Sequence, residues 1–332
     1  MGPALTVSVI ICAYTMDRWA ELVEAVRSLL RQTHPPEEVI VVVDGNDTLF
    51  ERARAELPEA RVVLNQDTPG ASGGRNTGVK HARGAIVAFI DDDAFAEPDW
   101  LKHLLTAYED PRTLGAGGGI VPLWREGRPA WFPDEFNWVV GCSYPGLPKT
   151  PEPVRNPIGT NLSMWREVFE TNGGFHPAFA RVTPPGGAIG TGTADETEFC
   201  IRASRARPGG RWIYVPDARV HHVVPSSRAT WSYFVGRCRM EGASKALLSE
   251  LAGAGAGLAS ERRYVRSVLP RALARELGRA LIGMDRAALR RAGSIVAGCA
   301  LTATAYFRAR AIATVGRRRN PLVASSSGPG RH

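Results

Sequence analysis

The sequence predicts an α/β protein with a doubly wound, largely parallel sheet, followed by a helical C-terminal region. Two observations predict the sheet: short runs of β-branched residues alternate with helical stretches through the first third of the chain, and these runs are almost continuously apolar. Strands of that kind are buried on both faces, as in parallel sheets covered by helices. A chain of 332 residues suits one large α/β domain with an appendage.

The individual elements follow from periodicity and residue type. We expect strands over residues 7–13, 39–43, 61–64 and 85–90, and a helix over 18–31 between the first two strands. Residues 124–153 are rich in Pro, Trp and Gly, which predicts a long ordered loop. Further regular elements are expected over 165–171, 195–205, 212–215 and 230–251.

The C-terminal region differs from the rest of the chain in its charge. Residues 260–332 contain 15 arginines, no lysine and three acids, a formal charge of +12 that leaves −4 for the remainder of a chain whose net charge is +8. We expect a basic helical region over 251–324, opening with a small-residue linker over 251–259, with helices over 262–282 and 285–311 and a disordered tail over 325–332. So basic a region predicts contact with a phosphate-rich surface.

Cysteine usage and the first residues bear on the compartment. The five cysteines are scattered and never spaced CxxC, which is typical of a reducing cytosol rather than of a disulfide framework or a zinc site. The N-terminus shows no basic segment ahead of a long apolar run, so we expect no signal peptide and a cytoplasmic protein. The scarcity of lysine and the lack of interleaved aromatic residues in the basic region argue against nucleic acid as a partner.

Carboxylates gather where two of the expected strands end. Asp44 follows the second strand, and Asp91, Asp92 and Asp93 follow the fourth. Ligands of doubly wound sheets bind at this edge. Three adjacent carboxylates repel one another unless a cation neutralises them, so the pattern favours Mg²⁺ or Mn²⁺, which in turn binds phosphate oxygens. The alternative is a helix start, with Asp92 or Asp93 capping a helix near residues 98–100.

A glycine-rich segment, residues 70–78, lies between these two strand ends. Its glycines would let the backbone approach a ligand, and Arg75 could pair bidentately with phosphate or carboxylate. A glycine-rich turn before a helix is more often a plain helix start. Its position between two acidic strand ends is what favours a binding role.

Eight short motifs follow one another through residues 9–222: VIICAY (9–14), VDG (43–45), GRNTG (74–78), FIDDD (89–93) with Pro98, GTN (159–161), GGF (173–175), DETEFCIR (195–202) and VHH (220–222). In this order they resemble the family 2 glycosyltransferases of GT-A fold, over about residues 6–240. The resemblance implies a Rossmann-like mixed sheet in a catalytic domain over 1–250, with a nucleotide-binding half over 1–123 and an acceptor half over 124–250. It also implies transfer with inversion.

The resemblance implies a nucleotide site at the strand ends. Ala13, Tyr14 and Asp44 would hold the nucleobase, and Arg75 would line the nucleotide pocket.

It also implies a metal site. Asp91 or Asp92 would bind the ribose, and Asp93 the divalent ion, Mg²⁺ or Mn²⁺. Related enzymes often place a histidine near the metal or the donor phosphates, which favours His222, although lone histidines are more often satisfied core or surface residues.

The acidic segment of the second half carries the mechanism. Family members typically read Glu-Asp-x-Asp/Glu-Leu with the second acid as catalytic base, whereas here Asp195 precedes Glu196. By position Glu196 takes the base role, and the inverted order keeps Asp195 as a competitor. An acceptor hydroxyl must lose its proton as it attacks the anomeric carbon, and burial would raise the pKa of such a base. The alternative makes Asp195 and Glu198 first-turn helix acids, with Glu198 paired to Arg202.

Two other residues are candidates for donor or acceptor contacts. Asn161 could contact hydroxyls of the donor sugar, or merely occupy a tight turn. Arg237 lies one helical turn from both Tyr233 and Glu241 and could contact the diphosphate or the acceptor, unless that helix face is simply solvated.

Residues 292–307 are mostly apolar and are flanked by arginines. The stretch is shorter than the roughly 20 residues that a membrane span needs. We expect either a helix lying on an anionic membrane surface or a helix packed on the catalytic body or on a second subunit.

The leading hypothesis is metal-assisted transfer of a sugar from a nucleotide sugar, with a UDP-sugar as default, to a saccharide, lipid-linked or small-molecule acceptor. One alternative is a sugar-phosphate nucleotidylyltransferase, but residues 13–18 do not form the basic glycine-rich loop with which such enzymes usually open. Another alternative is a non-catalytic nucleotide-sugar-binding protein. The presence of a candidate catalytic base in addition to the candidate metal-binding acids argues against it.

Overall fold

A computed structural model describes residues 5–176, 194–251, 253 and 259–319. Within these residues nine strands form one mixed sheet. Eight of them follow the order β3-β2-β1-β4-β8-β6-β9-β5, and β7 pairs with residues 212–214 of β9. The strands are β1 (Val7–Ala13), β2 (Glu38–Val43), β3 (Arg61–Leu64), β4 (Ile86–Asp91), β5 (Ala94–Ala96), β6 (Thr113–Trp124), β7 (Glu152–Val154), β8 (Asn161–Trp165) and β9 (Arg211–Val224).

The sheet changes character at β4. On one side β1 pairs in parallel with β2 and β4, and β2 with β3. On the other side β8 runs antiparallel to both β4 and β6. Strand order reverses beside β1, so the carboxyl ends of β1, β2 and β4 open onto the crevice where ligands of such sheets bind. The predicted mixed, Rossmann-like architecture is confirmed.

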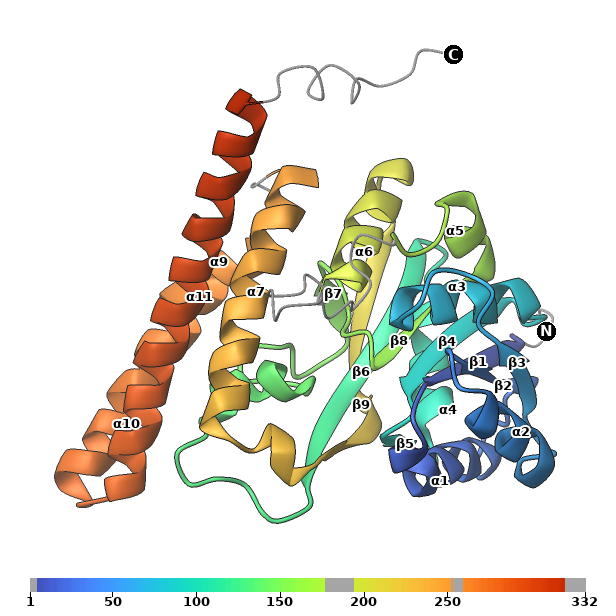
Figure 1. Cartoon of the computed structure of the whole chain (residues 1–332), viewed down its shortest axis with the longest axis horizontal. Helices are drawn as coiled ribbons and strands as arrows, with labels where there is room; N and C mark the ends of the chain where they lie inside the picture. The colour runs from blue at the N-terminus through green and yellow to red at the C-terminus, as the bar shows by residue number, and fades with distance from the viewer. Residues whose placement is uncertain (1–4, 177–193, 252, 254–258, 320–332) are drawn as a thin grey trace.

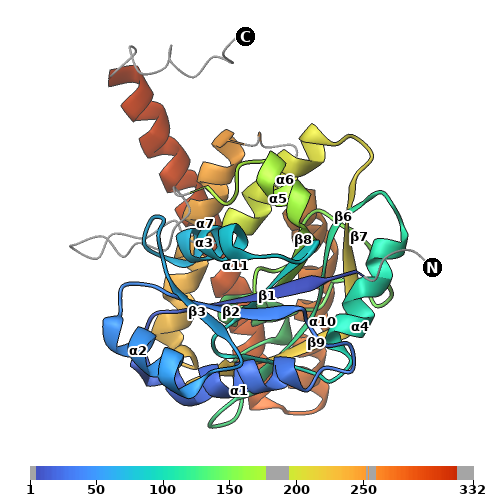
Figure 2. The same cartoon turned by 90° about the vertical axis from the view of Figure 1, so that its right-hand side faces the viewer.

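Helices cover both faces of the sheet (Figures 1 and 2). Side chains of β1 alternate between the two layers: Val9 and Ile11 pack with Leu22 of the first helix, while Ile10 packs with Val79 on the opposite face. The first layer is formed by α1 (Trp19–Leu30), α2 (Asp47–Glu56) and α4 (Trp100–Leu105), and the second by α3 (Ala71–His81), α5 (Arg166–Thr171) and α6 (Asp195–Ala206). Short 3-10 turns are η1 (Met16–Arg18), η2 (Thr106–Glu109), η3 (Asp134–Val140) and η5 (Ser226–Arg228).

Some sequence expectations need correction. The stretch expected as a long loop, 124–153, contains η3 and the start of β7. The strand expected over 212–215 continues to Val224, so His221 and His222 lie within β9 rather than after it. The helix after Pro98 begins at Trp100, and neither Asp92 nor Asp93 caps it, because its N-cap residue is Asp99.

The C-terminal region packs against the catalytic sheet domain as a set of helices. Helix α7 (Trp231–Leu251) is followed by α9 (Ala259–Arg263), a π-helical turn η6 (Tyr264–Val268), α10 (Leu269–Ile282) and α11 (Arg286–Arg319). In Figure 1 the hairpin of α10 and α11 lies at the left, with α11 alongside α7. Parts of the expected linker (252 and 254–258) and the expected tail (325–332) fall outside the described residues.

The apolar stretch 292–307 lies in α11, and one of its faces packs on the protein while Val296 and Phe307 are exposed. Ala292 and Ile295 are buried, and Gly298 packs against Phe136 and Phe234. The structure therefore supports packing on the catalytic body for this stretch, one of the two alternatives left open by the sequence. Within the described part of the chain, no helix combines the length and the apolar character that crossing a membrane would require.

Candidate active site

One large cavity connects the carboxyl ends of the parallel strands with the C-terminal helices. Its volume is about 1140 Å³. Residues of β1, β4, α3 and α6 line one end, and residues of α7, η6 and α11 line the other. Of the residues singled out in the sequence, it is lined by Ala13, Tyr14, Asp44, Arg75, Asp91, Asp92, Asp93, Asp195, Glu196, His222, Tyr233, Arg237 and Glu241. Motifs spread over more than 200 residues of sequence thus share one cavity.

Three side chains at the end of β4 and on β9 form a compact cluster. Asp91, Asp93 and His222 each offer one ligand atom, and these atoms all lie within 4.8 Å of one another. Strand β5 brings the histidine here, because Ala94 pairs directly with His222 across the ladder. Two carboxylates and an imidazole are donors that suit Mn²⁺ and, less specifically, Mg²⁺. The residues present therefore fit a divalent ion.

The cluster is already rich in cations. The Nε2 atom of His222 lies 3.1 Å from Asp93 Oδ1, and Arg18 and Arg228 lie 3.3 and 3.4 Å from Asp93 Oδ2. Burial lowers the pKa of His222, but the hydrogen bonds to Asp93 and Cys142, together with the charge of Asp93, outweigh burial and bring that pKa to about 10. An imidazole that ligates a metal is neutral, so metal binding here displaces a proton. Sequence reasoning missed Arg18 and Arg228, which no motif marks.

Asp92 is not part of the Asp91, Asp93 and His222 cluster and is paired with Arg18 instead. Its Oδ1 accepts a hydrogen bond from Arg18 at 2.8 Å, and its Oδ2 has no hydrogen-bond partner among the described residues. Burial raises the pKa of Asp92 to about 7, against the opposing charge of Arg18. Of the two aspartates considered for the ribose, the structure thus groups Asp91 with the metal candidates and leaves Asp92 with an unsatisfied buried oxygen at the cavity wall.

Arg75 joins the two acidic parts of the site. Its Nη1 lies 3.1 Å from Asp195 Oδ2, and its Nη2 lies 3.5 Å from Asp91 Oδ1. The arginine is 8% exposed, and the Thr160 hydroxyl donates to the other oxygen of Asp91 at 2.7 Å. One guanidinium therefore neutralises a carboxylate at the end of β4 and another at the start of α6.

The pair at the start of α6 is electrostatically unequal. Burial acts to raise the pKa of Asp195, but Arg75 and hydrogen bonds from Glu196 and Ser72 outweigh it, and the pKa is lowered. Burial and the neighbouring charge of Asp195 raise the pKa of Glu196 well above its usual range. Asp195 is thus held ionised in ion-pair and hydrogen bonds, whereas Glu196 lines the cavity with a raised pKa.

The presumed nucleotide end lies beyond Arg75 and is more open. Ala13 ends β1 and is buried, while the ring of Tyr14 is 55% exposed and lies beneath the guanidinium of Arg18. The Asp44 carboxylate accepts hydrogen bonds from Asn65 at 2.7 Å and from the backbone of Gly70 at 2.6 Å. Asp44 therefore also fixes the start of the glycine-rich helix α3.

Two further candidates have different positions. Arg237 lines the cavity from α7, where its Nε donates to the backbone of Val139 at 3.1 Å. Asn161 is fully buried in β8: its amide donates to Gly119 and Ala218, and its oxygen accepts from Trp100. The structure places Asn161 between strands and α4 instead of at the cavity, so the residues that the GTN motif brings to the cavity are Gly159 and Thr160.

The C-terminal helices supply the apolar end of the cavity, which no motif indicated. The lining there includes Phe136, Trp138, Tyr264, Val265, Leu269, Ala303, Tyr306 and Phe307. A charged cluster secures these helices: Arg155 binds Glu261 of α9 at 2.7 and 2.9 Å, and Lys245 of α7 lies 2.8 Å from the same carboxylate. The rings of Tyr144 and Tyr264 then continue the wall, with centroids 5.3 Å apart.

A mixed sheet whose parallel strands end in a carboxylate–histidine cluster, facing a cavity closed by a second half of the chain, is the architecture of the GT-A glycosyltransferases. Two solved structures share the fold: the mannosyltransferase PcManGT from Pyrobaculum calidifontis, in complex with GDP-Man and Mn²⁺ (TM-score 0.56, 17% identity, 92% of this chain and 88% of that chain), and GalNAc-T7 with UDP, GalNAc and Mn²⁺ (TM-score 0.50, 17% identity, 80% and 54%).

Sequence comparison identifies the family. Residues 8–173 match the family described as glycosyl transferase family 2. A glucosyl-dolichyl phosphate glucuronosyltransferase of Haloferax volcanii is 37% identical over 74% of this chain and 78% of its own length. The succinoglycan biosynthesis protein ExoM of Rhizobium meliloti is 27% identical over 70% and 72%. The chain belongs to glycosyl transferase family 2 and is a glycosyltransferase.

Proposed function

We propose that this protein transfers a sugar from a nucleoside diphosphate sugar to a hydroxyl of a lipid-linked saccharide, with inversion at the anomeric carbon. The observation that carries the proposal is the shared cavity, in which the carboxylate cluster, Glu196 and an apolar compartment meet. The carboxylates suit the donor, and the apolar compartment suits the hydrocarbon part of the acceptor.

The donor occupies the end of the cavity formed by the parallel strands. Asp91, Asp93 and His222 would hold a divalent ion there, Mn²⁺ or Mg²⁺. When bound, the ion supplies positive charge that stabilises the departing diphosphate. Tyr14 offers an exposed ring at the mouth of the site, to which a nucleobase can stack. The two similar solved structures were obtained with UDP or GDP-Man together with Mn²⁺, which supports this class of donor.

Glu196 acts as the general base. Burial and the charge of Asp195 raise the pKa of Glu196, which makes its ionised form a stronger base toward the proton of the acceptor hydroxyl. Asp195 is held by Arg75 and Ser72 and serves to orient the pair and to tune its partner. With a base and no separate nucleophile assigned, the transfer is a single displacement, and a single displacement inverts the configuration.

The acceptor enters along the C-terminal helices. The compartment lined by Tyr264, Leu269, Ala303 and Phe307 is largely apolar and continuous with the catalytic end. The Haloferax volcanii relative is named for a glucosyl-dolichyl phosphate, a sugar carried on a lipid. Transfer to a lipid-linked sugar would place the hydrocarbon chain in this compartment and the sugar beside Glu196.

The donor proposal is tested by thermal shift with UDP-, GDP- and dTDP-sugars in the presence and absence of Mn²⁺. We expect one donor to raise the melting temperature only with Mn²⁺, because a ligand at a hundredfold excess over Kd stabilises the folded state by about 2.7 kcal/mol. Asp93→Ala should lose this stabilisation and donor turnover. Asp217→Ala, an exposed acid on the same strand as His222, is the matched control. Mn²⁺-dependent donor turnover that survives in Asp93→Ala would contradict the metal assignment.

A further inference from the structure

The turn between α10 and α11 exposes large apolar side chains. Leu281 is 81% exposed, Ile282 is 91% exposed and Met284 is 86% exposed, all within four consecutive positions. Leu277 and Leu289 on the adjoining helical turns are 40% and 60% exposed. An apolar cluster of this kind on a folded surface marks an interaction site. The turn lies at the lower left of Figure 1, at the end of the molecule.

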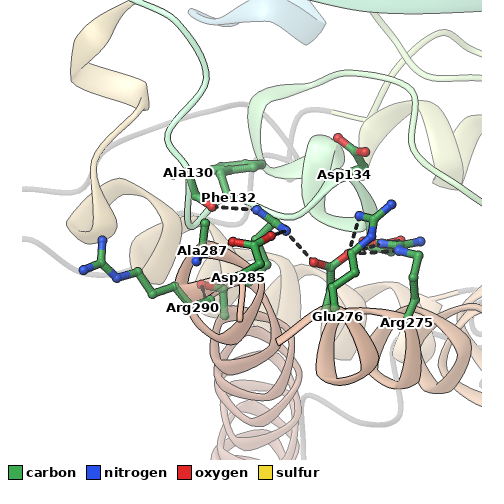
Figure 3. Close-up of polar contacts among 12 residues, drawn as sticks. Ala130, Phe132, Asp134, Arg275, Glu276, Asp285, Ala287 and Arg290 are labelled. Atoms are coloured by element: carbon green, nitrogen blue, oxygen red, sulfur yellow. Dashed lines mark hydrogen bonds and ion pairs between the residues drawn. The ribbon is translucent and has the colours of Figure 1, made fainter. Parts of the chain in front are cut away.

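The same segment is strongly basic. Residues 269–291 contain six arginines and two acids. Both acids are already paired: Glu276 lies within 3.3 Å of Arg275, Arg279 and Arg291, and Asp285 lies 3.0 Å from Arg291. Among the described residues, the exposed Arg271, Arg286 and Arg290 of this segment therefore have no paired acid on the hairpin. In the close-up of Figure 3, Arg290 points away from the Glu276 cluster.

Ion pairs and hydrogen bonds at the base of the hairpin join it to the catalytic body (Figure 3). The buried Glu276 forms ion pairs with Arg275, Arg279 and Arg291 at the base of the hairpin. Arg291 then donates to the backbone of Ala130 at 3.2 Å, and Arg275 lies 3.1 Å from Glu135 of η3. The inner face of the hairpin supplies buried Ala272 and Ala288. The apolar turn is thus exposed although the rest of the hairpin is well packed.

We infer that this turn, the hairpin tip formed by Leu277, Leu281, Ile282, Met284 and Leu289, docks on an anionic lipid bilayer. Its apolar side chains enter the boundary between headgroups and acyl chains, while the surrounding arginines contact lipid phosphates. An apolar edge rimmed by arginine is complementary to such a surface and to no uncharged one. None of these residues lines the cavity, so the inference stands independently of the transfer chemistry.

The inference is tested by vesicle sedimentation with the full chain. Vesicles of phosphatidylcholine alone are compared with an equimolar mixture of phosphatidylcholine and phosphatidylglycerol. We expect binding to the anionic vesicles, weakened by salt because exposed charges are screened. Leu281→Ser with Ile282→Ser should reduce the partition coefficient at least about tenfold, since two side chains lose their burial. Arg286→Glu with Arg290→Glu should reduce binding to the anionic vesicles.

Matched controls keep the result specific. Leu30→Ser removes an exposed leucine of α1, and Arg27→Glu with Arg54→Glu reverses two exposed charges, one on α1 and one on α2. Both controls should bind as the wild type does, and all variants should keep its melting temperature because the replaced side chains are exposed. Wild-type protein that stays in the supernatant overturns the inference. So does a dimer in sedimentation velocity that Leu281→Ser with Ile282→Ser dissociates, which would show a second copy as the occupant.

Discussion

The two ends of the cavity are built in opposite ways. At the sheet end, charged side chains from β4, α3, α6 and β9 are held by one another: Arg75 bridges Asp91 and Asp195, and His222 pairs with Asp93. At the helical end, the walls are mainly aromatic and aliphatic side chains of η3, η6 and α11. The first end has geometry suited to chemistry, the second has surface suited to binding hydrocarbon.

The comparison teaches that the two tasks are separable within one cavity. A change at the sheet end disturbs a network of buried charges, where loss of one partner leaves another uncompensated. A change among the apolar side chains of the helical end, such as Ala303 or Phe307, alters shape and apolar area. We therefore expect variants at the sheet end to affect turnover, and variants at the helical end to affect the acceptor KM.

The largest expected effect is at Glu196. Glu196→Gln keeps the shape of the side chain but cannot accept a proton, so kcat should fall by about 10²–10⁴-fold, the usual contribution of a general base. The measurement is the rate of transfer to a lipid-linked sugar, with donor binding followed separately by thermal shift. Donor binding should survive. A Glu196→Gln enzyme with wild-type kcat would remove Glu196 from the mechanism.

A smaller effect is expected at the helical end. Ala303→Trp projects a large ring from α11 into the apolar compartment, which should raise the KM for a prenyl-linked acceptor about tenfold, the consequence of overfilling a packed apolar site. Hydrolysis of the donor in the absence of acceptor should not change. Ala300→Trp, also exposed on α11 but outside the cavity lining, serves as the control. Equal KM values for the two variants would contradict the assignment of this compartment to the hydrocarbon part of the acceptor.

The smallest effect is a displaced pH profile. The charge of Asp195 raises the pKa of Glu196, so removing that charge in Asp195→Asn lowers it. A base with a lower pKa is ionised at lower pH, and the acid limb of kcat/KM should therefore move to lower pH. Steady-state rates across the acid range give the result. An unmoved limb, or one displaced to higher pH, would show that Asp195 does not tune the base.

Much of the sheet end could be predicted from sequence. The apolar strands and the acids that follow them are local signals, and parallel strand ends necessarily meet at one edge. The antiparallel half was harder, because β6 contains Gly115, Gly117, Gly118 and Gly119, residues that are poor in strands by propensity. The structure explains all four, because a Cβ on any of them would lie 1.8 to 2.8 Å from a backbone oxygen, the shortest being from Gly118 to Ala218.

Other features depend on contacts that sequence does not display. Asn161 belongs to a motif, yet its amide is used entirely between strands and α4. Arg228 reaches Asp93 from a short turn that has no distinctive pattern. The apolar compartment needs α11 to fold back beside α7, a pairing set by long-range packing, so the C-terminal region could be predicted as helical and basic but not as a wall of the cavity.

Two glycines of the segment 70–78, Gly73 and Gly78, illustrate how a motif can serve a ligand site without lining it. A Cβ on Gly73 would lie 1.8 Å from the backbone oxygen of Thr68, and one on Gly78 would lie 2.4 Å from the side chain of Ile10. Gly73 lets the start of α3 close against the preceding loop, and Gly78 lets α3 pack directly on β1; together these close approaches set where Arg75 projects. In a random library we expect no substitution of Gly73 or Gly78 to be tolerated, although an added Cβ at either position would contact protein atoms and not the ligand.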